Sequence, residues 1–535
     1  MKLQNETSMK KLLITLTIGS IAFSGFIASN NIQQTNTHQA PMLANILAPA
    51  KNQTFQSAVL GDTDVRGTCT YVVNEIAVTP SPIPVSACSV GSGKDGVCTV
   101  TGSVNLTSTS CSGRGSADAP NYSVIENVVS GTSTITLADA PTGLIIDDEV
   151  MIINMRGTAT DMGTVGAYEI KKVSAITANT ITLNSALTTG YNGTTQKIMV
   201  QRVPQYSSMT INAGATLTAS AWDGTKNGVL AVKVNGELIN NGTIDMSAKG
   251  YRGGTQGGSD AGGQGGESYC GLGGNGGANN SNGLIGAAGG GDGNAIPASG
   301  SKGGNGSCGG GGGSNGSADA AVLLTLQGKG STTSGGAGGG GSMSSGSGAG
   351  AGYGSAGSKN REKATEAGEN TSGNGWGGGG AGGTYGSAEL SKVYMGSGGG
   401  RGGANNTGTG GVGGNGGGII YIGAKTITAG LIANSGANGG AKTDTSAAVC
   451  SGSGGIGGCS GGGGAGSGGS IILNGEVITL SSSTKSLGGT GGIGFLLSAG
   501  QQYGGNGGVG RIAAYYSNTL TGESNPIQYK ANTCK

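Results

Sequence analysis

Residues 228–254 read GVLAVKVNGELINNGTIDMSAKGYRGG. Apolar residues alternate with other residues in three short stretches, and the pairs Asn235-Gly236 and Asn241-Gly242 separate these stretches. Alternation predicts strands with one buried face, and Asn-Gly is a strong turn signal. The spacing therefore predicts one coil of a parallel β-solenoid, with short strands, tight corners and an inward stack of aliphatic side chains.

The same pattern returns twice near the C-terminus. Residues 417–440 read GGIIYIGAKTITAGLIANSGANGG, and residues 469–492 read GSIILNGEVITLSSSTKSLGGTGG. A shorter fragment at 508–516 has the features of a last partial coil. Because coils of one rod stack on each other, we expect residues 228–250 to lie beside residues 417–435. Everything between them would then be one excursion.

That excursion, residues 255–416, consists mainly of glycine and small polar residues. Much of it is built from GGx steps, as in GGVGGNG at 410–416. A period of three suits an extended helix with three residues per turn, and chains without Cβ atoms can approach closely enough to hydrogen-bond laterally. The period favours a polyglycine-II bundle, and the alternative is a flexible linker. The cost of ordering a residue is comparable to the gain from one hydrogen bond, so energetics alone leave both open.

The predicted fold class is all-β. Residues 119–205 are rich in Val, Ile and Thr between Gly, Asn and Asp turns, which predicts a small β-barrel or sandwich before the interrupted solenoid. Its expected strands are 122–129, 133–137, 149–154, 168–176, 180–183 and 197–203. The expected order along the chain is a signal peptide (1–29), a linker (30–60), a Cys-bearing module (61–118), the small β domain (119–205), the first solenoid coils (206–254), the glycine-rich region (255–416) and C-terminal coils with glycine-rich loops (417–535).

Composition excludes several protein classes. Gly accounts for 120 of the 535 residues and aromatic residues for 4%, so the chain cannot bury a conventional apolar core along its whole length. The 10 Pro residues and the lack of a strict G-X-Y period argue against collagen. The formal net charge is +2 without a cluster of Lys and Arg, which argues against a nucleic-acid partner.

The N-terminal segment resembles a secretory signal in its layout. Lys10 and Lys11 precede an apolar stretch at 12–27, and small and polar residues follow it. The alternative is a membrane anchor, but a spanning helix needs about 20 apolar residues. No later stretch is long and apolar enough to span a membrane. We therefore expect a secreted protein or an extracellular cell-surface protein, with no membrane span once the signal is removed.

Nine cysteines follow that segment: Cys69, Cys88, Cys98, Cys111, Cys270, Cys308, Cys450, Cys459 and Cys534. Export makes disulfides the default, and the lack of CxxC pairs disfavours zinc. We expect the first four to pair among themselves, Cys270 to pair with Cys308, and Cys450 to pair with Cys459. The odd count leaves one thiol, and Cys534 is the candidate for a free or intermolecular thiol.

Motifs that would indicate catalysis are isolated. GxSxG occurs around Ser314 and Ser460, but the only His is His38 in the predicted linker, so a nucleophile elbow would lack its base. A single turn at 289–294 resembles a calcium-binding repeat without the tandem copies that such sites need. The carboxylates at 147–149 could act as a pair in glycoside hydrolysis or form a charged turn. We expect no enzyme activity, no catalytic residue, no cofactor and no metal.

Aromatic residues in or near the glycine-rich region are the candidates for ligand contacts. Exposed rings on loops could stack on sugars, whereas buried rings would fill the space that glycine leaves. The six candidates are Tyr251, Tyr269, Tyr353, Trp376, Tyr385 and Tyr394.

A family resemblance rests on four short motifs: Val203-Pro204-Gln205-Tyr206, Trp222-Asp223-Gly224, the strand GVLAVKVNG at 228–236, and Gly250-Tyr251-Arg252-Gly253-Gly254. With the later coils, this layout resembles bacterial glycine-rich secreted or surface proteins, some labelled gliding-motility-like or adhesin-like. The resemblance implies a β-solenoid with glycine-rich loops and an extracellular role. The glycine-rich part is also similar in composition to the polyglycine-II bundles of phage tail-tip adhesins and of an insect-like antifreeze protein, but its GGx phase is interrupted often.

Three functions compete on this basis. The first is a non-catalytic structural or adhesive protein of the cell surface. The second is an adhesin whose loop aromatics bind a carbohydrate or a partner, and the third is a polysaccharide-active enzyme on a solenoid. The expected partners are a second copy of the chain, cell-envelope polymers or glycans.

Overall fold

The computed structural model describes residues 88–255, 262–273, 336–339, 347–358, 379–404, 409–443, 460–497 and 500–535. It also gives the backbone of four short strands, β1 (Leu13–Leu16), β2 (Cys69–Val72), β18 (Arg361–Glu362) and β19 (Glu366–Ala367). The chain divides into two compact units, Met1–Pro84 and Val85–Lys535. In the first unit β1 pairs antiparallel with β2. The second unit contains the remaining strands, and its described residues form no helix, so the predicted all-β class is confirmed.

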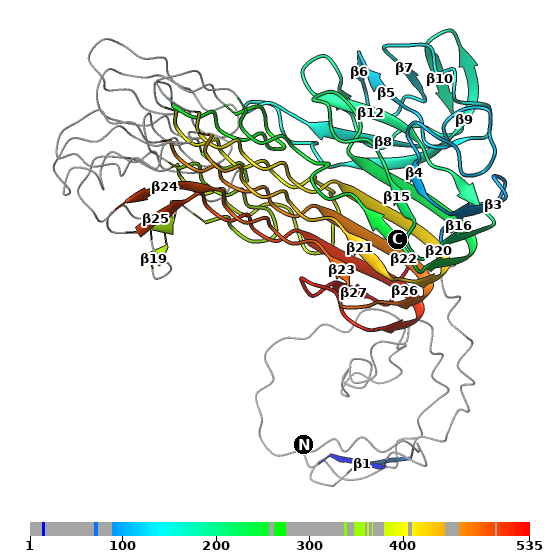
Figure 1. Ribbon diagram of the computed structural model, residues 1–535. Helices are drawn as coiled ribbons and strands as arrows, with labels where there is room; N and C mark the ends of the chain where they lie inside the picture. Colours follow the sequence, from blue (N-terminus) through cyan, green and yellow to red (C-terminus); the bar gives the residue numbers. More distant parts are fainter. Residues whose placement is uncertain are drawn as a thin grey trace, which may run out of the picture. The chain divides into compact units, whose positions relative to one another are not determined.

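Two parallel sheets form the body of the second unit (Figure 1). The larger has the strand order β27-β26-β22-β20-β16-β14-β3, and β13 also pairs with β16. The smaller has the order β23-β21-β17-β15-β4. The strands of the larger sheet are β3 (Val97–Val100), β13 (Gln205–Tyr206), β14 (Ser208–Ile211), β16 (Val229–Asn240), β20 (Ile419–Thr428), β22 (Ser470–Thr479), β26 (Arg511–Thr521) and β27 (Tyr529–Ala531). Those of the smaller are β4 (Ser103–Asn105), β15 (Thr216–Thr218), β17 (Thr243–Asp245), β21 (Leu431–Ala433) and β23 (Thr484–Lys485).

Each strand of the smaller sheet directly follows a strand of the larger one, so successive turns of the chain add one strand to each sheet. The distant segments meet as expected, because β16 pairs in parallel with β20 and places Val229 opposite Ile419. The same register places Leu230 beside Ile420, which in turn lies beside Ile471 of β22. These side chains belong to one buried cluster between the sheets. Stacked identical positions therefore build the core that alternation predicted.

One predicted corner is wrong. Asn235-Gly236 does not end a strand, because β16 continues through it with a shift of register between Val234 and Glu237. A Cβ at Gly236 would lie 2.7 Å from the carbonyl oxygen of Ser207, the residue between β13 and β14. Glycine thus lets the neighbouring backbone approach while the strand continues. The second pair, Asn241-Gly242, does form the turn between β16 and β17.

Residues 121–202 form a small barrel. Its antiparallel strand order is β5-β12-β8-β9-β10-β7, and a bridge between Val124 and Leu137 joins the two outer strands and closes the sheet. The strands are β5 (Asn121–Val124), β7 (Thr134–Thr136), β8 (Glu149–Arg156), β9 (Tyr168–Thr177), β10 (Thr180–Leu183) and β12 (Lys197–Arg202). A short pair, β6 (Asn127–Val128) with β11 (Tyr191–Asn192), extends it, so the single strand expected at 122–129 is two strands.

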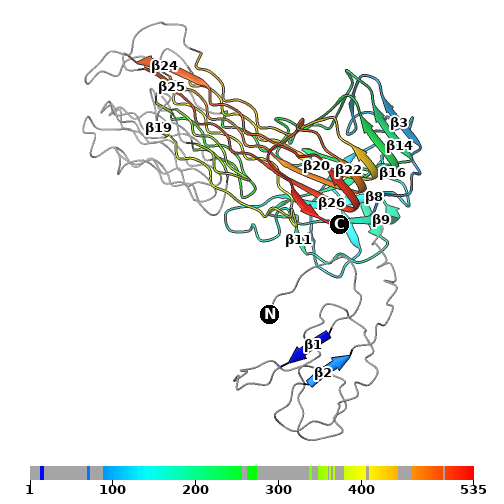
Figure 2. The same cartoon turned by 90° about the horizontal axis from the view of Figure 1, so that it is seen from below.

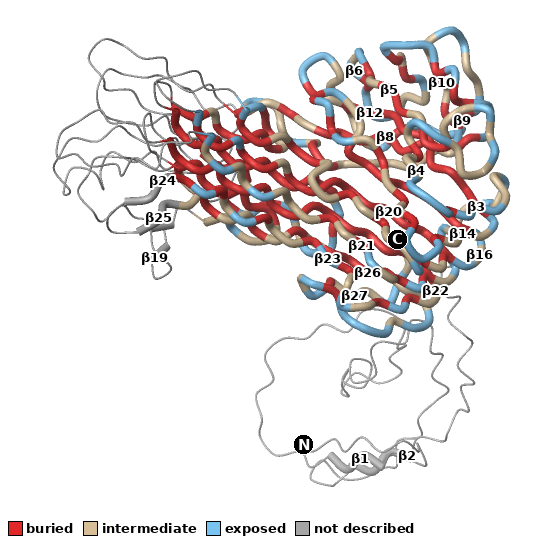
Figure 3. The backbone as a smooth tube through the Cα atoms, viewed as in Figure 1, coloured by how far each residue is buried: buried red, intermediate tan, exposed pale blue. Residues whose placement is uncertain are grey.

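The barrel packs on the outer face of the larger parallel sheet. Side chains of β8 alternate between the barrel interior, as Ile152 does, and a second cluster that includes Met151 and Ile153. Tyr421 of β20 belongs to that second cluster. Both faces of β8 are therefore buried, and Figure 3 shows buried backbone running from the barrel into the sheets.

The last described sheet is small. It contains β24 (Ile493–Leu497) and β25 (Gly500–Tyr503), which pair antiparallel, and β18 pairs with β25.

Two neighbouring residues on β21 differ in burial, so they test which face of the strand packs in the core. Ile432 is fully buried between the sheets, whereas the side chain of Leu431 points outward and is 38% exposed. We expect Ile432→Ala to lower the free energy of unfolding by about 2–5 kcal/mol, because it leaves a cavity. Leu431→Ala should cost about 1 kcal/mol or less. Denaturant unfolding of both variants measures the difference, and equal costs would contradict the assigned faces.

Candidate functional site

The glycine-rich segments of the second unit lie side by side as a bundle of extended chains (Figure 2). We call them the glycine bundle, and they are joined by backbone hydrogen bonds between segments far apart in the sequence. The described segments are 250–255, 262–268, 336–339, 347–358, 379–383, 395–404, 409–418, 434–443, 460–469, 486–492 and 504–510. The bundle is thus larger than the predicted region 255–416, because glycine-rich loops of the C-terminal coils also belong to it.

Segment 411–417 shows the three-residue period of the bundle. Its N–H groups at every third position, beginning with Gly411, donate to segment 461–467. The N–H groups of Gly413 and Gly416 donate to segment 251–254. The carbonyls of Val412 and Asn415 accept from segment 437–440, and the carbonyls at every third position from Gly411 accept from segment 396–402. Because each neighbouring segment is contacted at every third residue, the segment has three residues per turn, which is the geometry that the GGx steps predicted. In the described residues, the linker interpretation is therefore wrong.

Segment 396–403 lies at the centre of the bundle. It exchanges backbone hydrogen bonds with six neighbours, namely residues 251–254, 264–267, 338, 349, 411–417 and 461–467. A Cβ at Gly399 would collide with the carbonyl of Gly464, and one at Gly400 would collide with that of Gly339. Glycine is required here because each neighbouring carbonyl occupies the place of a side chain.

The bundle continues directly into the larger parallel sheet at one end. Gly418 precedes β20, Gly469 precedes β22, and Gly510 precedes β26. Strands and bundle segments are consecutive parts of the same chain turns. The apolar core therefore anchors the glycine segments in register.

At the opposite end, the described segments are joined by another group of hydrogen bonds. Gly461 donates to Gly403, and Thr443 donates to Thr409. The N–H of Gly379 donates to Ser347, whose neighbour Gly348 donates to segment 460–469. These residues flank four stretches, 340–346, 359–378, 405–408 and 444–459, which lie outside the described residues apart from the backbone of β18 and β19 in the second. The described residues beside these stretches therefore lie at the end of the bundle remote from the parallel sheets, which we call the distal end.

Four of the aromatic residues expected to contact a ligand are buried. Tyr251 and Tyr353 are 0% exposed, and Tyr385 and Tyr394 are only 7% and 9% exposed. Tyr269 is half-buried with its ring centroid 4.8 Å from that of Tyr385. For these four the burial favours the packing alternative, because the rings fill space where the bundle meets the sheet. Trp376 lies outside the described residues.

Hydrogen bonds fix this tyrosine cluster. The hydroxyl of Tyr353 lies 2.7 Å from the hydroxyl of Ser470 at the start of β22, and the hydroxyl of Tyr385 donates to the carbonyl of Met395 at 2.9 Å. Burial raises the pKa of Tyr353 to about 12, so this hydroxyl stays protonated at neutral pH. The cluster joins bundle and sheet and offers no ring face to a ligand.

The other candidate residues for catalysis or metal binding are either buried or outside the described residues. Ser460 is fully buried in the bundle, whereas Ser314, His38 and residues 289–294 lie outside the described residues. Among the residues that the structure describes, no group of three or more His, Cys, Asp or Glu side chains could hold a metal ion. No helix in the described part of the chain is long and apolar enough to cross a membrane.

The carboxylates at 147–149 form a turn and a buried ion-pair network. Asp147 has a φ of 69°, as a turn residue can, and Asp148 is fully buried. A carboxylate oxygen of Asp148 lies 2.9 Å from Nε of Arg202, and its other ion pairs are to Lys94 and Arg114. Burial alone would raise the pKa of Asp148, but Arg202, Lys94 and a backbone hydrogen bond from Ile145 lower it overall. No sequence pattern indicates this pairing, because the partners of Asp148 are distant along the chain.

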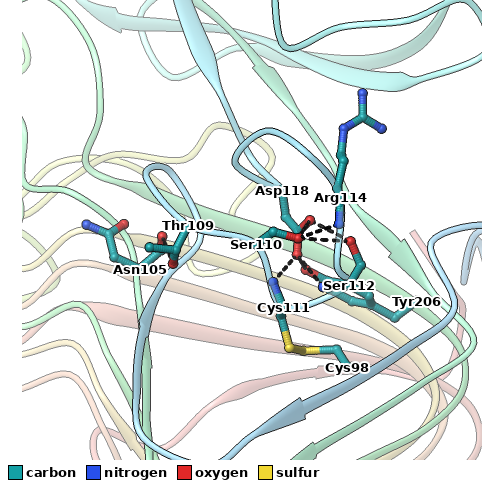
Figure 4. The surroundings of a disulfide bond; sticks show 9 residues. All are labelled: Cys98, Asn105, Thr109, Ser110, Cys111, Ser112, Arg114, Asp118 and Tyr206. Carbon is teal, nitrogen blue, oxygen red and sulfur yellow. Dashed lines mark hydrogen bonds between the residues drawn. A yellow bond between two sulfur atoms is a disulfide. The ribbon is translucent and has the colours of Figure 1, made fainter.

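The Asp118 carboxylate lies beside the Cys98–Cys111 disulfide, next to β3, the first strand of the larger parallel sheet in the sequence (Figure 4). The carboxylate accepts hydrogen bonds from the backbone N–H of Cys111 at 2.7 Å and from the hydroxyls of Ser112 and Tyr206 at 2.7 and 2.8 Å. Burial would raise the pKa of Asp118, but these hydrogen bonds hold it below its ordinary value. The loop that Asp118 organises places Leu106 over the core.

The disulfides depart from the expected pairing. Cys98 pairs with Cys111 beside Asp118, within the group expected to pair internally. Cys88 instead pairs with Cys534, 446 residues away, so the expectation of a free thiol at Cys534 is wrong. The reason is tertiary, because β26 and the residues after it return to the part of the sheet near Cys88. Cys270 is also disulfide-bonded. Cys308, Cys450 and Cys459 lie outside the described residues, and the side chain of Cys69 is not described.

No protein-family model matches the sequence, and no curated protein matches it. Solved structures of phage tailspikes show weak similarity. The tailspike protein gp49 of Pseudomonas phage LKA1 is 15% identical over 28% of this chain and 32% of its own, with a TM-score of 0.14. The Gp54 tailspike of Acinetobacter baumannii bacteriophage AP22, solved with A. baumannii capsular saccharide, is 13% identical over 24% and 22%, with a TM-score of 0.16. The Pseudomonas phage phi297 tailspike gp61 is 17% identical over 28% and 26%, with a TM-score of 0.15. The matches span about a third or less of each tailspike.

A matched pair of substitutions tests whether close packing at the bundle centre requires glycine. We expect Gly399→Ala to lower the free energy of unfolding by about 1–3 kcal/mol, because neighbouring segments must move apart. Gly102→Ala is the control, since a Cβ there meets nothing within 4 Å, and it should change stability by about 0.5 kcal/mol or less. Hydrogen exchange at the Gly254 N–H, which donates to Gly399, should accelerate only in the first variant. Equal stability of both variants would contradict close packing.

We expect the Asp118 carboxylate to make a pH-dependent contribution to the free energy of unfolding. We expect Asp118→Asn to cost about 1.5–3 kcal/mol at pH 7, because the carboxylate accepts several hydrogen bonds. Since its pKa in the folded state is lowered, this stabilisation exists above the unfolded value of about 3.9 and disappears as the pH falls through the folded value. The difference between variant and wild type should therefore shrink below about pH 4. Unfolding at several pH values measures it, with exposed Asp139→Asn as the control; a pH-independent difference would argue against the carboxylate's role.

Proposed function

We propose that the protein is an exported, non-catalytic structural and adhesive protein that presents binding segments at the distal end of a rigid glycine bundle. The observation that carries this proposal is the attachment of four stretches to the same end of one continuous hydrogen-bonded structure. Chain segments at the end of a rigid scaffold are a common arrangement for binding sites. The parallel sheets and the barrel would form the base.

The disulfides support an extracellular location. Cys88 and Cys534 are bonded, as are Cys98 and Cys111, and such bonds persist in oxidising compartments. The apolar N-terminal segment at 12–27 fits export by a cleaved signal. The low content of charged residues, 10%, and the lack of a basic cluster fit a polymer or glycan partner better than a nucleic acid.

The proposed role needs no catalytic step. The described carboxylates of 148–149 are engaged in ion pairs, and Ser460 is packed within the bundle. Four of the six aromatic residues first considered for ligand contact are buried. We therefore place binding in the four distal stretches, one of which contains Trp376.

Replacement of the distal stretches tests this function. Each of 340–346, 368–378, 405–408 and 444–459 is replaced in turn by a Gly-Ser linker of equal length in the full chain, which leaves β18 and β19 in place. We expect at least one variant to bind whole cells or arrayed glycans about tenfold more weakly, with an unchanged midpoint of thermal unfolding. Val129→Ser on the barrel, where Val129 is 73% exposed, is the control and should bind normally. Wild-type binding by all four variants, or no binding by the full chain, would contradict the adhesive role.

A further inference from the structure

A cleft of about 510 Å³ lies at the other end of the unit, between the barrel and the larger parallel sheet. The start of β8, strand β9, β16 and β20 all contribute to its lining. Its volume is within the range of small-molecule sites, roughly 300–1,000 Å³, and is far larger than a bare inorganic anion requires. The cleft involves neither the distal end nor the tyrosine cluster.

The floor of the cleft holds a fixed ion pair. Nζ of Lys233 lies 2.8 Å from a carboxylate oxygen of Glu149 and donates to the hydroxyl of Ser89 at 2.9 Å. The side chain of Lys233 is only 4% exposed. These contacts already hold the ammonium group of Lys233 in place. An anion that binds beside it therefore causes little further loss of side-chain conformational entropy.

Further lysines give the lining an excess of positive charge. Nζ of Lys171 lies 3.3 Å from Glu169, whereas the side chain of Lys172 makes no ion pair with any described residue and is exposed at the rim. Lys535 also lines the cleft, with Nζ 5.3 Å above the ring of Tyr168. The cations thus outnumber the carboxylates of Glu149 and Glu169, which favours a ligand with negative charge.

The remaining lining groups suit a sugar. Hydroxyl and amide side chains come from Ser185, Ser391 and Asn184, and apolar surface comes from Tyr168 and Tyr421. Hydroxyls and amides can exchange hydrogen bonds with sugar hydroxyls, while aromatic and aliphatic surfaces pack against the C–H face of a sugar ring. A phosphate or sulfate ion alone would leave most of these groups without a contact.

The long-range disulfide borders this cleft. Cys88 precedes Ser89, and Cys534 precedes Lys535, so the bond between them joins two lining residues from opposite ends of the unit. The wall of the cleft therefore depends on a covalent link that forms only when the chain has folded in an oxidising environment. The bond covalently links two lining residues that the folded sheet has brought together.

We propose that this cleft binds the carboxylate-bearing unit of an acidic saccharide. The carboxylate lies beside Lys172 and Lys233, and the sugar ring lies toward Tyr168. The site is independent of the distal stretches and would give the base of the protein its own contact with an acidic polymer.

Calorimetric titration of the full chain with trigalacturonate tests the proposal. The wild type should bind trigalacturonate, and neutral maltotriose should not bind at the same concentrations. Lys172→Gln should weaken binding about tenfold, since one charged contact is lost, whereas Lys172→Arg should retain it. Lys425→Gln is the matched control, because Lys425 is exposed on β20 and does not line the cleft.

Several results would overturn the site. These are equal binding of maltotriose, no binding of trigalacturonate, or equal weakening by Lys425→Gln and Lys172→Gln. Competition by inorganic sulfate at the concentration of the sugar would show a simple anion site and would also overturn it. The four distal replacements leave the cleft intact and should bind trigalacturonate normally, so this proposal and the adhesive function can fail separately.

Discussion

In the glycine bundle, carbonyl oxygens of one segment occupy the volume that side chains would take on the next. At Gly399 and Gly400 a Cβ would collide with a neighbouring carbonyl, and the same holds along segments 411–417 and 461–467. This close approach lets each segment hydrogen-bond to several neighbours in rotation. The absence of side chains is therefore the condition for order here, although the same residues carry the largest conformational entropy when unfolded.

Lateral hydrogen bonds alone return little net free energy, because the unfolded chain bonds equally well to water. The bundle instead gains its stability from continuity with the parallel sheets. Ile420, Ile471 and Ile512 form an apolar ladder, and each of their strands begins directly after a bundle segment. Once that core forms, the starting points of the glycine segments are fixed in register, which removes much of the entropy that would oppose their association.

Polar interactions join the modules around this core. Asp148, which directly precedes barrel strand β8, pairs with Arg202 at the end of β12. It also pairs with Lys94 and Arg114, which precede the barrel in the sequence. Asp118 organises the loop that covers the end of the stack. Such buried groups stabilise only as complete sets, since losing one partner leaves an uncompensated charge. The tyrosine cluster has the equivalent role between sheet and bundle, where large rings fill space next to small residues.

Local pattern in the sequence determined the all-β class, the parallel coils and the three-residue period, because alternation and GGx spacing act through the backbone of each segment alone. It also predicted that residues 228–250 and 417–435 are neighbours, since repeated units stack. Only the tertiary structure decided that Cys88 meets Cys534, that Tyr353 and Tyr385 are buried, and that Asn235-Gly236 lies within a strand. It likewise assembled the lysine-lined cleft from Lys172, Lys233 and Lys535. These features depend on contacts between segments that share no repeated pattern, so neither alternation nor GGx spacing indicates which of them meet.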